Sequence, residues 1–194
     1  MIETKRLLLR PFREEDAQDL YAYLKEPMVR CFACMQVNSL EEAKAAALER
    51  AKDTEYYFAI VLKENGKVIG EIDAMPETPA PDEKNAVLDT FSPCWMLHPD
   101  YYGKGYALEA AEAFFDYLFA QKGARRIYAY TEDYNLPSQR LCEKLGMRRE
   151  GLFLEFVSFV NDADGEPIYE NTLQYAILKK EWQARKTGER SASL

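Results

Sequence analysis

Tyr102-Gly103-Lys104-Gly105-Tyr106-Ala107 is the stretch that decides the fold. It lies between an apolar run that ends at Leu97 and a long amphipathic run that begins near Leu108. A strand, a turn with two glycines and a helix, in this order, gather unpaired backbone N–H groups where the helix dipole adds partial positive charge. Such a turn suits a phosphate or pyrophosphate, because glycine lets the backbone approach the ligand without a Cβ atom in the way.

Two common glycine loops do not fit this stretch. A Walker-type loop needs Ser or Thr directly after Gly-Lys to hold magnesium, and here Gly105 follows Lys104. A dinucleotide-binding loop needs a third Gly or Ala three residues after the second glycine, and Leu108 stands there. Taken alone, the six residues also allow a plain chain reversal before a helix, without any ligand.

Hydrophobic periodicity around the turn predicts the order β-α-α-β-β-β-α-β-α-β-β, a single α/β domain with a mixed sheet. Strands are expected at 7–10, 56–62, 68–75, 87–97, 126–131, 152–160 and 168–178, and helices at 14–24, 39–52, 108–123 and 137–145. Residues 76–84 contain three prolines and predict a loop, and Pro93 indicates an edge, a bulge or local splaying of its strand. The domain is expected to span 4–182, followed by a polar, frayed tail at 183–194.

Composition limits the classes of partner. The 194 residues carry a net charge of −8, which argues against a general nucleic-acid binder and is compatible with a cationic substrate such as an amine. No apolar run approaches the roughly 18 to 20 residues of a membrane span. The charged start of the chain lacks the apolar core of a signal peptide, so a cytoplasmic protein without a membrane partner is expected.

The cysteines do not predict a metal site. Cys31 and Cys34 have the spacing of a redox or zinc pair, but the chain has no second such pair and His98 is its only histidine. Cys94 and Cys142 lie in distant segments. All four are therefore interpreted as free thiols in a reducing compartment, and no metal is expected.

Two segments of the chain resemble motifs of a known family, and the distance between them also matches that family. WMLHPDYYGKGYALEA (95–110) resembles the acetyl-CoA-binding motif of the GNAT superfamily of N-acetyltransferases. Gly105 and Ala107 match the small positions of that motif, whereas Tyr102 stands where Gln or Arg is usual. NLPSQRLCEKLGM (135–147) resembles the family's Asn-x-x-Ala/Ser segment that ends in Lys-Leu-Gly-Phe. The resemblance covers residues 4–182. Within the superfamily, the chain is similar in particular to the branch of ribosomal-protein amino-terminal acetyltransferases.

This resemblance implies a fold and an activity. The fold would be a GNAT-like mixed, mostly antiparallel twisted sheet flanked by helices. The activity would be transfer of an acetyl group from acetyl-CoA to a primary amine, above all a protein amino terminus or a small amine, by a monomer or a homodimer. An antibiotic or polyamine acetyltransferase and a non-catalytic acyl-CoA-binding module remain alternatives.

The resemblance also implies which residues contact acetyl-CoA. Its pyrophosphate would bind the backbone N–H groups of Tyr102, Gly103, Lys104, Gly105, Tyr106 and Ala107. Its pantetheine arm would run beside Met96, Leu97 and His98, where the N–H of Leu97 is the candidate that polarises the thioester carbonyl. Asn135 would contact the cofactor, and the alternative for this residue is a helix N-cap.

For the chemistry, Ser138 is the candidate proton donor to the leaving sulfur, since the tyrosine position used by many family members is Cys142 here. The strand position where the family often has a carboxylate is Ser92. Glu71 on the preceding strand is therefore the candidate base, with Glu132 or Asp133 as alternatives. An α-amino group of pKa about 8 loses its proton at pH 7 for about 1.4 kcal/mol and a lysine for about 4.6 kcal/mol, so the missing carboxylate favours an amino terminus.

Aromatic side chains could form the wall of an acceptor pocket, although their spacing is also typical of core residues. They are Tyr21, Tyr23, Phe32, Tyr56, Tyr57, Phe153, Phe156 and Phe159.

Overall fold

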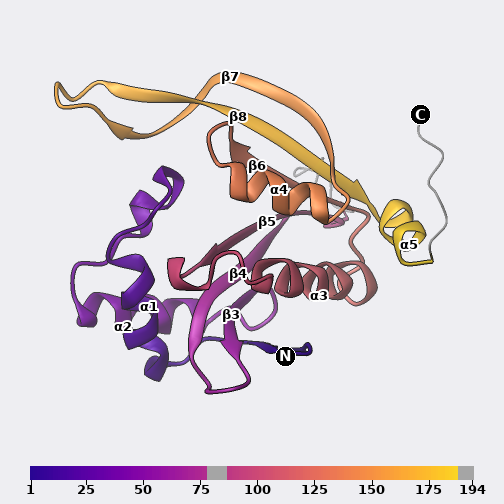
Figure 1. Ribbon diagram of the computed structural model, residues 1–194, viewed down its shortest axis with the longest axis horizontal. Coiled ribbons are helices and arrows are strands. Elements are labelled where there is room, and N and C mark those ends of the chain that lie inside the picture. Colours follow the sequence, from indigo (N-terminus) through magenta and orange to yellow (C-terminus); the bar gives the residue numbers. More distant parts are fainter. Residues whose placement is uncertain (78–86, 188–194) are drawn as a thin grey trace.

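An eight-stranded sheet in the order β1-β2-β3-β4-β5-β6-β8-β7 forms the centre of the molecule (Figure 1). The computed structural model describes residues 1–77 and 87–187. Every pair of neighbouring strands is antiparallel except β5 and β6, which are parallel, so the predicted mixed, mostly antiparallel sheet is confirmed. The strands are β1 Ile2–Glu3, β2 Leu7–Arg10, β3 Tyr57–Leu62, β4 Val68–Glu77, β5 Thr90–Leu97, β6 Arg126–Glu132, β7 Arg148–Asn161 and β8 Pro167–Leu178.

Helices cover both faces of this sheet. The α-helices are α1 Ala17–Leu24, α2 Leu40–Arg50, α3 Tyr106–Ala120, α4 Leu136–Lys144 and α5 Lys179–Thr187, and the 3-10 helices are η1 Glu14–Asp16, η2 Arg30–Met35 and η3 Pro99–Tyr101. Helices α3 and α4 pack on one face and α1 and α2 on the other, each with its own buried cluster. Among the described helices, none combines the length and the apolar character that a membrane crossing requires.

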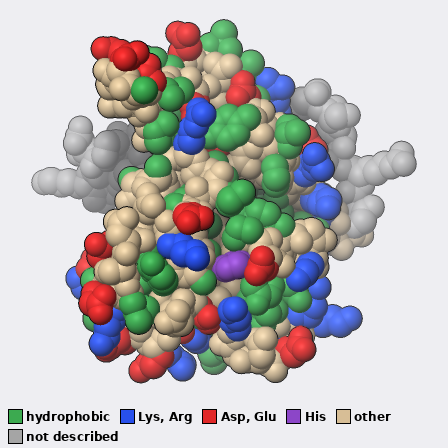
Figure 2. Space-filling model, turned by 60° about the vertical axis from the view of Figure 1, so that its left-hand side comes forward, with side chains coloured by type: hydrophobic (Ala, Val, Ile, Leu, Met, Phe, Trp, Pro, Cys, Tyr) green, Lys and Arg blue, Asp and Glu red, His purple; other side chains and the backbone are tan. Residues whose placement is uncertain are grey.

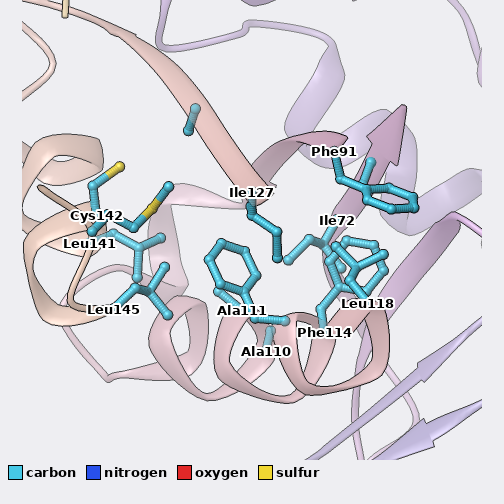
Figure 3. Close-up of a cluster of buried hydrophobic side chains, with 14 of the residues drawn as sticks. Ile72, Phe91, Ala110, Ala111, Phe114, Leu118, Ile127, Leu141, Cys142 and Leu145 are labelled. Atoms are coloured by element: carbon cyan, nitrogen blue, oxygen red, sulfur yellow. The ribbon is translucent and has the colours of Figure 1, made fainter. Parts of the chain in front are cut away.

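The predicted apolar stripe of α3 is the centre of the larger cluster. Ala111, Phe115 and Leu118 are fully buried, whereas Leu108 is half-buried at the edge of the cluster. Figure 3 shows α3 side chains, including Phe114, beside Ile72, Phe91 and Ile127 from the sheet and Leu141, Cys142 and Leu145 from α4. Burial of side chains of this size contributes about 1.5–3 kcal/mol each, so this interface accounts for much of the stability.

Hydrogen bonds from two side chains cap the start of α2. Ser39 is the N-cap and its Oγ accepts from the Glu42 N–H at 3.1 Å. The Glu42 carboxylate accepts from the N–H of Asn38 at 2.8 Å. The helix thus begins at the predicted place, with Ser39 as its boundary.

Strands β5 and β6 separate soon after they meet. All of β5 pairs with β4, but only Thr90 and Phe91 pair with β6. His98 N–H donates to Ile69 O on β4 at 2.8 Å, so, by the alternation of a strand, the backbone groups of Pro93, Trp95 and Leu97 point away from β4 toward the separation. Pro93 therefore removes no hydrogen bond from the β4–β5 ladder, and local splaying is the correct one of its three interpretations.

A close approach of β4 and β5 accompanies this separation. A Cβ atom built on Gly70 would lie 2.1 Å from Met96 O and 2.8 Å from Leu97 Cα. The register of β3 and β4 shifts next to Gly70, between Ile60 and Val61. Only glycine can fill a position so close to the neighbouring backbone.

Element ends differ from the predictions at several places. β5 begins at Thr90 and not at residue 87, and the predicted loop at 76–84 lies outside the described residues except for Pro76 and Glu77, which belong to β4. β7 begins before residue 152, at Arg148, in a charged stretch whose side chains form ion pairs with Arg126 and Glu181. Residues 183–187 belong to α5, which Trp182 anchors through its Nε1–H to Asp116 at 2.8 Å.

Substitution of Gly70 tests the close approach. Gly70→Ala should lower the free energy of unfolding by about 3 kcal/mol or more, because backbone atoms cannot move away from the new methyl group. The control Gly165→Ala, at a turn with φ +87° and nothing within 4 Å of the added methyl, should cost only about 1 kcal/mol. Urea unfolding measures both, and equal losses would contradict the close approach.

Candidate functional site

A cavity of about 680 Å³ lies where β5 and β6 separate. On β5, Met96 belongs to the cluster under α1 and α2, whereas Leu97 belongs to the cluster under α3. Both side chains line the cavity, so it runs from one face of the sheet to the other. We call the part lined by η2, Tyr130 and Glu132 the η2 side and the part lined by the turn before α3 and by α4 the α3 side.

Most of the predicted cofactor residues meet in this cavity. The lining includes Met96, Leu97, Tyr102, Gly103, Gly105, Tyr106, Ala107 and Asn135, together with Ser138. His98, Lys104 and Glu71 lie outside it. His98 is not free to pair with a ligand through its backbone N–H, which donates to Ile69, and its ring Nδ1 accepts from the Asp100 N–H at 3.2 Å.

The turn before α3 presents a row of free backbone donors. Gly105 is the N-cap of α3 with φ +79°, and the first bond that closes the helix runs from Glu109 N to Gly105 O. The N–H groups of residues 103–108 find no acceptor in the part of the chain that the structure describes. The N–H of Tyr102 donates to Pro99 O at 3.0 Å, so this N–H is not free to bind a pyrophosphate, although Tyr102 lines the cavity.

The connection between β1 and β2 holds this turn in place, which the sequence did not reveal. The Glu109 carboxylate accepts from Thr4 Oγ1 at 2.6 Å and from the backbone and side chain of Arg6 at 2.7 and 2.6 Å. Arg6 also donates to Lys104 O at 2.9 Å and stacks on the Tyr106 ring. Burial alone would raise the pKa of Glu109, but these hydrogen bonds outweigh it and the pKa lies below its usual value. The only signal was that Thr4 and Arg6 fall within the family resemblance.

Ser138 belongs to a polar chain that connects both sides of the cavity. Its Oγ accepts from Trp95 Nε1–H at 3.2 Å, which leaves the hydroxyl hydrogen free to donate. Asn135 is the N-cap of α4, since its Oδ1 accepts from the Ser138 N–H at 3.3 Å, and its Nδ2 donates to Glu132 at 3.2 Å. The N-cap alternative for Asn135 is therefore correct, and its contact with a cofactor stays a prediction.

Glu71, the candidate base, is a member of a buried ion pair. It is 2% exposed, and its carboxylate accepts from Tyr23 and Tyr57 at 2.8 Å each and from Arg50 at 3.1 and 3.2 Å. Hydrogen bonds from these three side chains occupy both oxygens of the carboxylate. Its place outside the lining and these bonds both argue against the base assignment.

Asp73 is an acid that sequence reasoning missed. It follows Glu71 by two residues on β4, so both side chains share one face, and it pairs in register with Cys94, whose side chain lines the cavity. Burial, and then the charge of Glu71, raise the pKa of Asp73 to about 7, although Arg50 opposes them. This spacing on one strand face was the signal in the sequence.

The thiols of the site are protonated at neutral pH. Burial raises the pKa of Cys31 and of Cys94, with smaller contributions from nearby acids. Burial also raises the pKa of Cys142 to about 12, and Cys142 is part of the hydrophobic core and not of the lining. Within residues 1–77 and 87–187, no group of three His, Cys, Asp or Glu side chains could hold a metal ion.

Among the candidate wall residues, Tyr23, Phe32 and Phe159 line the cavity. Phe153 and Phe156 are exposed and contact each other and Tyr130, so the expectation of a core position is wrong for them. Phe153 pairs with Thr172, which faces Glu132 at the end of β6, and Phe156 follows it on β7. The β7–β8 hairpin extends beyond this end of β6 (Figure 1). Figure 2 shows several apolar side chains near the middle of one face, with charged side chains around them.

Comparisons with known proteins agree on one family. The model of the acetyltransferase (GNAT) domain matches residues 6–148. The uncharacterised N-acetyltransferase YnaD of Bacillus subtilis is 34% identical over 181 residues, which cover 93% of this chain and 98% of YnaD. The crystal structure of a GNAT-family acetyltransferase from Bacillus anthracis is 28% identical, with a TM-score of 0.78 over 93% of this chain and 99% of that one. The ribosomal-protein-S5-alanine acetyltransferase from Vibrio fischeri has the same fold, with a TM-score of 0.68 at 21% identity over 93% of this chain and 97% of that one.

Replacement of Asp73 tests the half-buried carboxyl group. An ordinary Asp has a pKa of 3.8 and Asp73 one of about 7, so the wild type should lose stability as the pH rises from about 4 to about 7. Asp73→Asn removes the ionisation and should raise the free energy of unfolding by on the order of 2–4 kcal/mol at pH 8 and by much less at pH 4. Thermal unfolding at both pH values measures this, with Asp164→Asn at an exposed turn as the control. A gain independent of pH would contradict the raised pKa.

Proposed function

The chain belongs to the GNAT family of N-acetyltransferases, and on this premise we propose that it transfers the acetyl group of acetyl-CoA to a protein amino terminus or a small primary amine. The observation that carries the proposal is the row of free N–H groups at residues 103–108, at the N-terminus of a 15-residue helix that borders the cavity. Oriented N–H groups and the helix dipole together favour a pyrophosphate at this place.

The charges of the α3 side support the same cofactor. The protein carries a net charge of −8, yet Arg140 and Lys144 of α4 line the cavity. Within residues 1–77 and 87–187, its only acidic lining residue is Glu132, on the η2 side. Trp95 and Leu97 turn their backbone groups toward the cavity, where a pantetheine amide can pair with them. Acetyl-CoA supplies the activated thioester when it is bound.

Direct transfer fits the groups that the cavity offers. The amine nitrogen attacks the thioester carbon, the C–N bond forms, the C–S bond breaks, and the amine releases one proton to solvent water, which returns a proton to the Ser138 oxygen. In this proposal the N–H of Leu97 stabilises the developing oxyanion, and the Ser138 hydroxyl protonates the departing sulfur. A cysteine intermediate would need a thiolate, and the raised pKa values of Cys31 and Cys94 oppose one.

Glu71 has another role in this proposal. Its carboxylate fixes the hydroxyl of Tyr23, which lines the cavity, and it compensates Arg50. Removal of one partner of such a buried pair leaves the other charge uncompensated. We therefore assign Glu71 to the support of the cavity wall and not to proton transfer.

A matched pair of glycine substitutions tests the cofactor site. Gly103 and Gly123 have φ of +73° and +74°, and a Cβ atom on either meets nothing within 4 Å, so alanine should cost each the same stability. Gly103 lines the cavity, however, and Gly123 does not. Gly103→Ala should raise the Kd for acetyl-CoA about tenfold or more in calorimetry, and Gly123→Ala should leave it unchanged. No acetyl-CoA binding by the wild type, or equal effects of both variants, would refute the site.

Ser138 distinguishes a catalyst from a binding module. Ser138→Ala should lower kcat about tenfold to a hundredfold and leave the Kd for acetyl-CoA within twofold, because the lost hydroxyl acts on the leaving sulfur. Thiol release with a panel of amines measures turnover. Unchanged turnover would remove Ser138 from the mechanism, and tight binding without turnover on any amine by the wild type would favour the non-catalytic module.

A further inference from the structure

The η2 side of the cavity has largely apolar walls. Met28, Phe32 and Met35 come from the segment at and before η2, Tyr130 from β6 and Phe159 from β7. The structure packs η2 against β7, so this wall is formed by segments more than a hundred residues apart. Thioether and aromatic side chains of this kind favour an apolar ligand.

One carboxylate interrupts these apolar walls. Among the described residues, Glu132 is the only acidic one in the lining, and it is 6% exposed. Its contacts are Asn135 Nδ2 at 3.2 Å and the Cys31 thiol, which burial keeps protonated. No Lys or Arg forms an ion pair with Glu132 among the residues that the structure describes. A buried carboxylate without a cation is costly, and a bound ammonium group would compensate it.

The other acids near this wall are either paired with an arginine or outside the cavity lining. Glu170 is paired with Arg30 at 3.1 Å and accepts from the Tyr134 hydroxyl at 3.0 Å. Glu71 is paired with Arg50, and Asp73 is outside the lining. The cavity thus offers one negative site for one positive charge, while Arg140 and Lys144 on its α3 side would repel a second.

We propose that the acceptor is a primary monoamine whose amino group is attached to an apolar group, and that Glu132 binds its ammonium form on the η2 side, from which one proton leaves to solvent before the nitrogen attacks. This inference rests on the proposed transferase function. The apolar group contacts Phe32, Met35 and Phe159. The second ammonium group of a polyamine would meet apolar walls or cations. Two sources share the required chemistry: a small alkyl- or arylalkylamine, and a peptide with an apolar first residue.

Initial rates of thiol release from acetyl-CoA test the acceptor class. We expect kcat/KM for 2-phenylethylamine or n-hexylamine, or for a peptide that begins with Leu, to exceed that for spermidine at least tenfold. The same peptide with Asp at its start should be at least tenfold poorer than the Leu peptide. The better of the amine and the Leu peptide identifies the source, and a preference for spermidine would overturn the proposal.

Substitution of Glu132 tests the ammonium site. Glu132→Gln should raise KM for the preferred amine at least tenfold and leave KM for acetyl-CoA within twofold, whereas Glu132→Asp, which keeps the charge, should restore part of the loss. The control Glu143→Gln removes a charge from an exposed position of α4 and should change neither KM. Circular dichroism and thermal unfolding check that each variant is folded. An unchanged amine KM in folded Glu132→Gln would overturn the assignment.

The two proposals fail in different ways. If acetyl-CoA binds and no amine in the panel is acetylated, the transferase function fails, and the acceptor class fails with it. If amines are acetylated but spermidine is preferred, or if Glu132→Gln leaves the KM for the amine unchanged, only the proposed acceptor class is refuted.

Discussion

The separation of β5 from β6 after two residue pairs is the constraint on which the rest of the structure depends. Buried backbone groups must be hydrogen-bonded, so a strand that loses its neighbour inside a sheet needs another partner. Here the strand that loses its neighbour borders a cavity, and a ligand can provide the missing partner. The neighbouring strand is brought close at Gly70, so that β5 keeps its pairing with β4 along its whole length.

Both strands that separate lead into helices that begin at the cavity. β5 leads through η3 and the glycine turn into α3, and β6 leads through Asn135 into α4. The same separation therefore brings together the free N–H groups of one helix start and the Ser138 hydroxyl of the other. The chain from Glu132 through Asn135 and Ser138 to Trp95 spans the opening from the η2 side to the α3 side. An amine bound at one end and a thiol departing at the other would thus be linked through hydrogen bonds.

Four carboxyl groups on β4, β6 and β8 differ in their surroundings, and these surroundings determine what each group can do. Glu71 and Glu170 each form an ion pair with an arginine and connect parts of the fold. Asp73 is half-buried, and its desolvation together with the nearby charge of Glu71 favours its protonated form. Glu132 is buried without a cation and faces the cavity, and this distinguishes a group that can receive a ligand from groups that are already satisfied.

The sequence by itself determined the order of the α-helices and strands from β2 to β8, the glycine turn and the family, but not β1 or α5. Local patterns carry these features: alternation in strands, helical spacing in α3, and glycine where the backbone turns. The sequence placed Ser138 and most of the turn at the site because they are close in sequence to those patterns. Only the tertiary structure decided which of the acids faces the cavity, that Thr4 and Arg6 hold the turn through Glu109, and that Glu71 is paired with Arg50. These contacts join residues 21 to 105 positions apart, and no local pattern records which distant side chain will neutralise a charge.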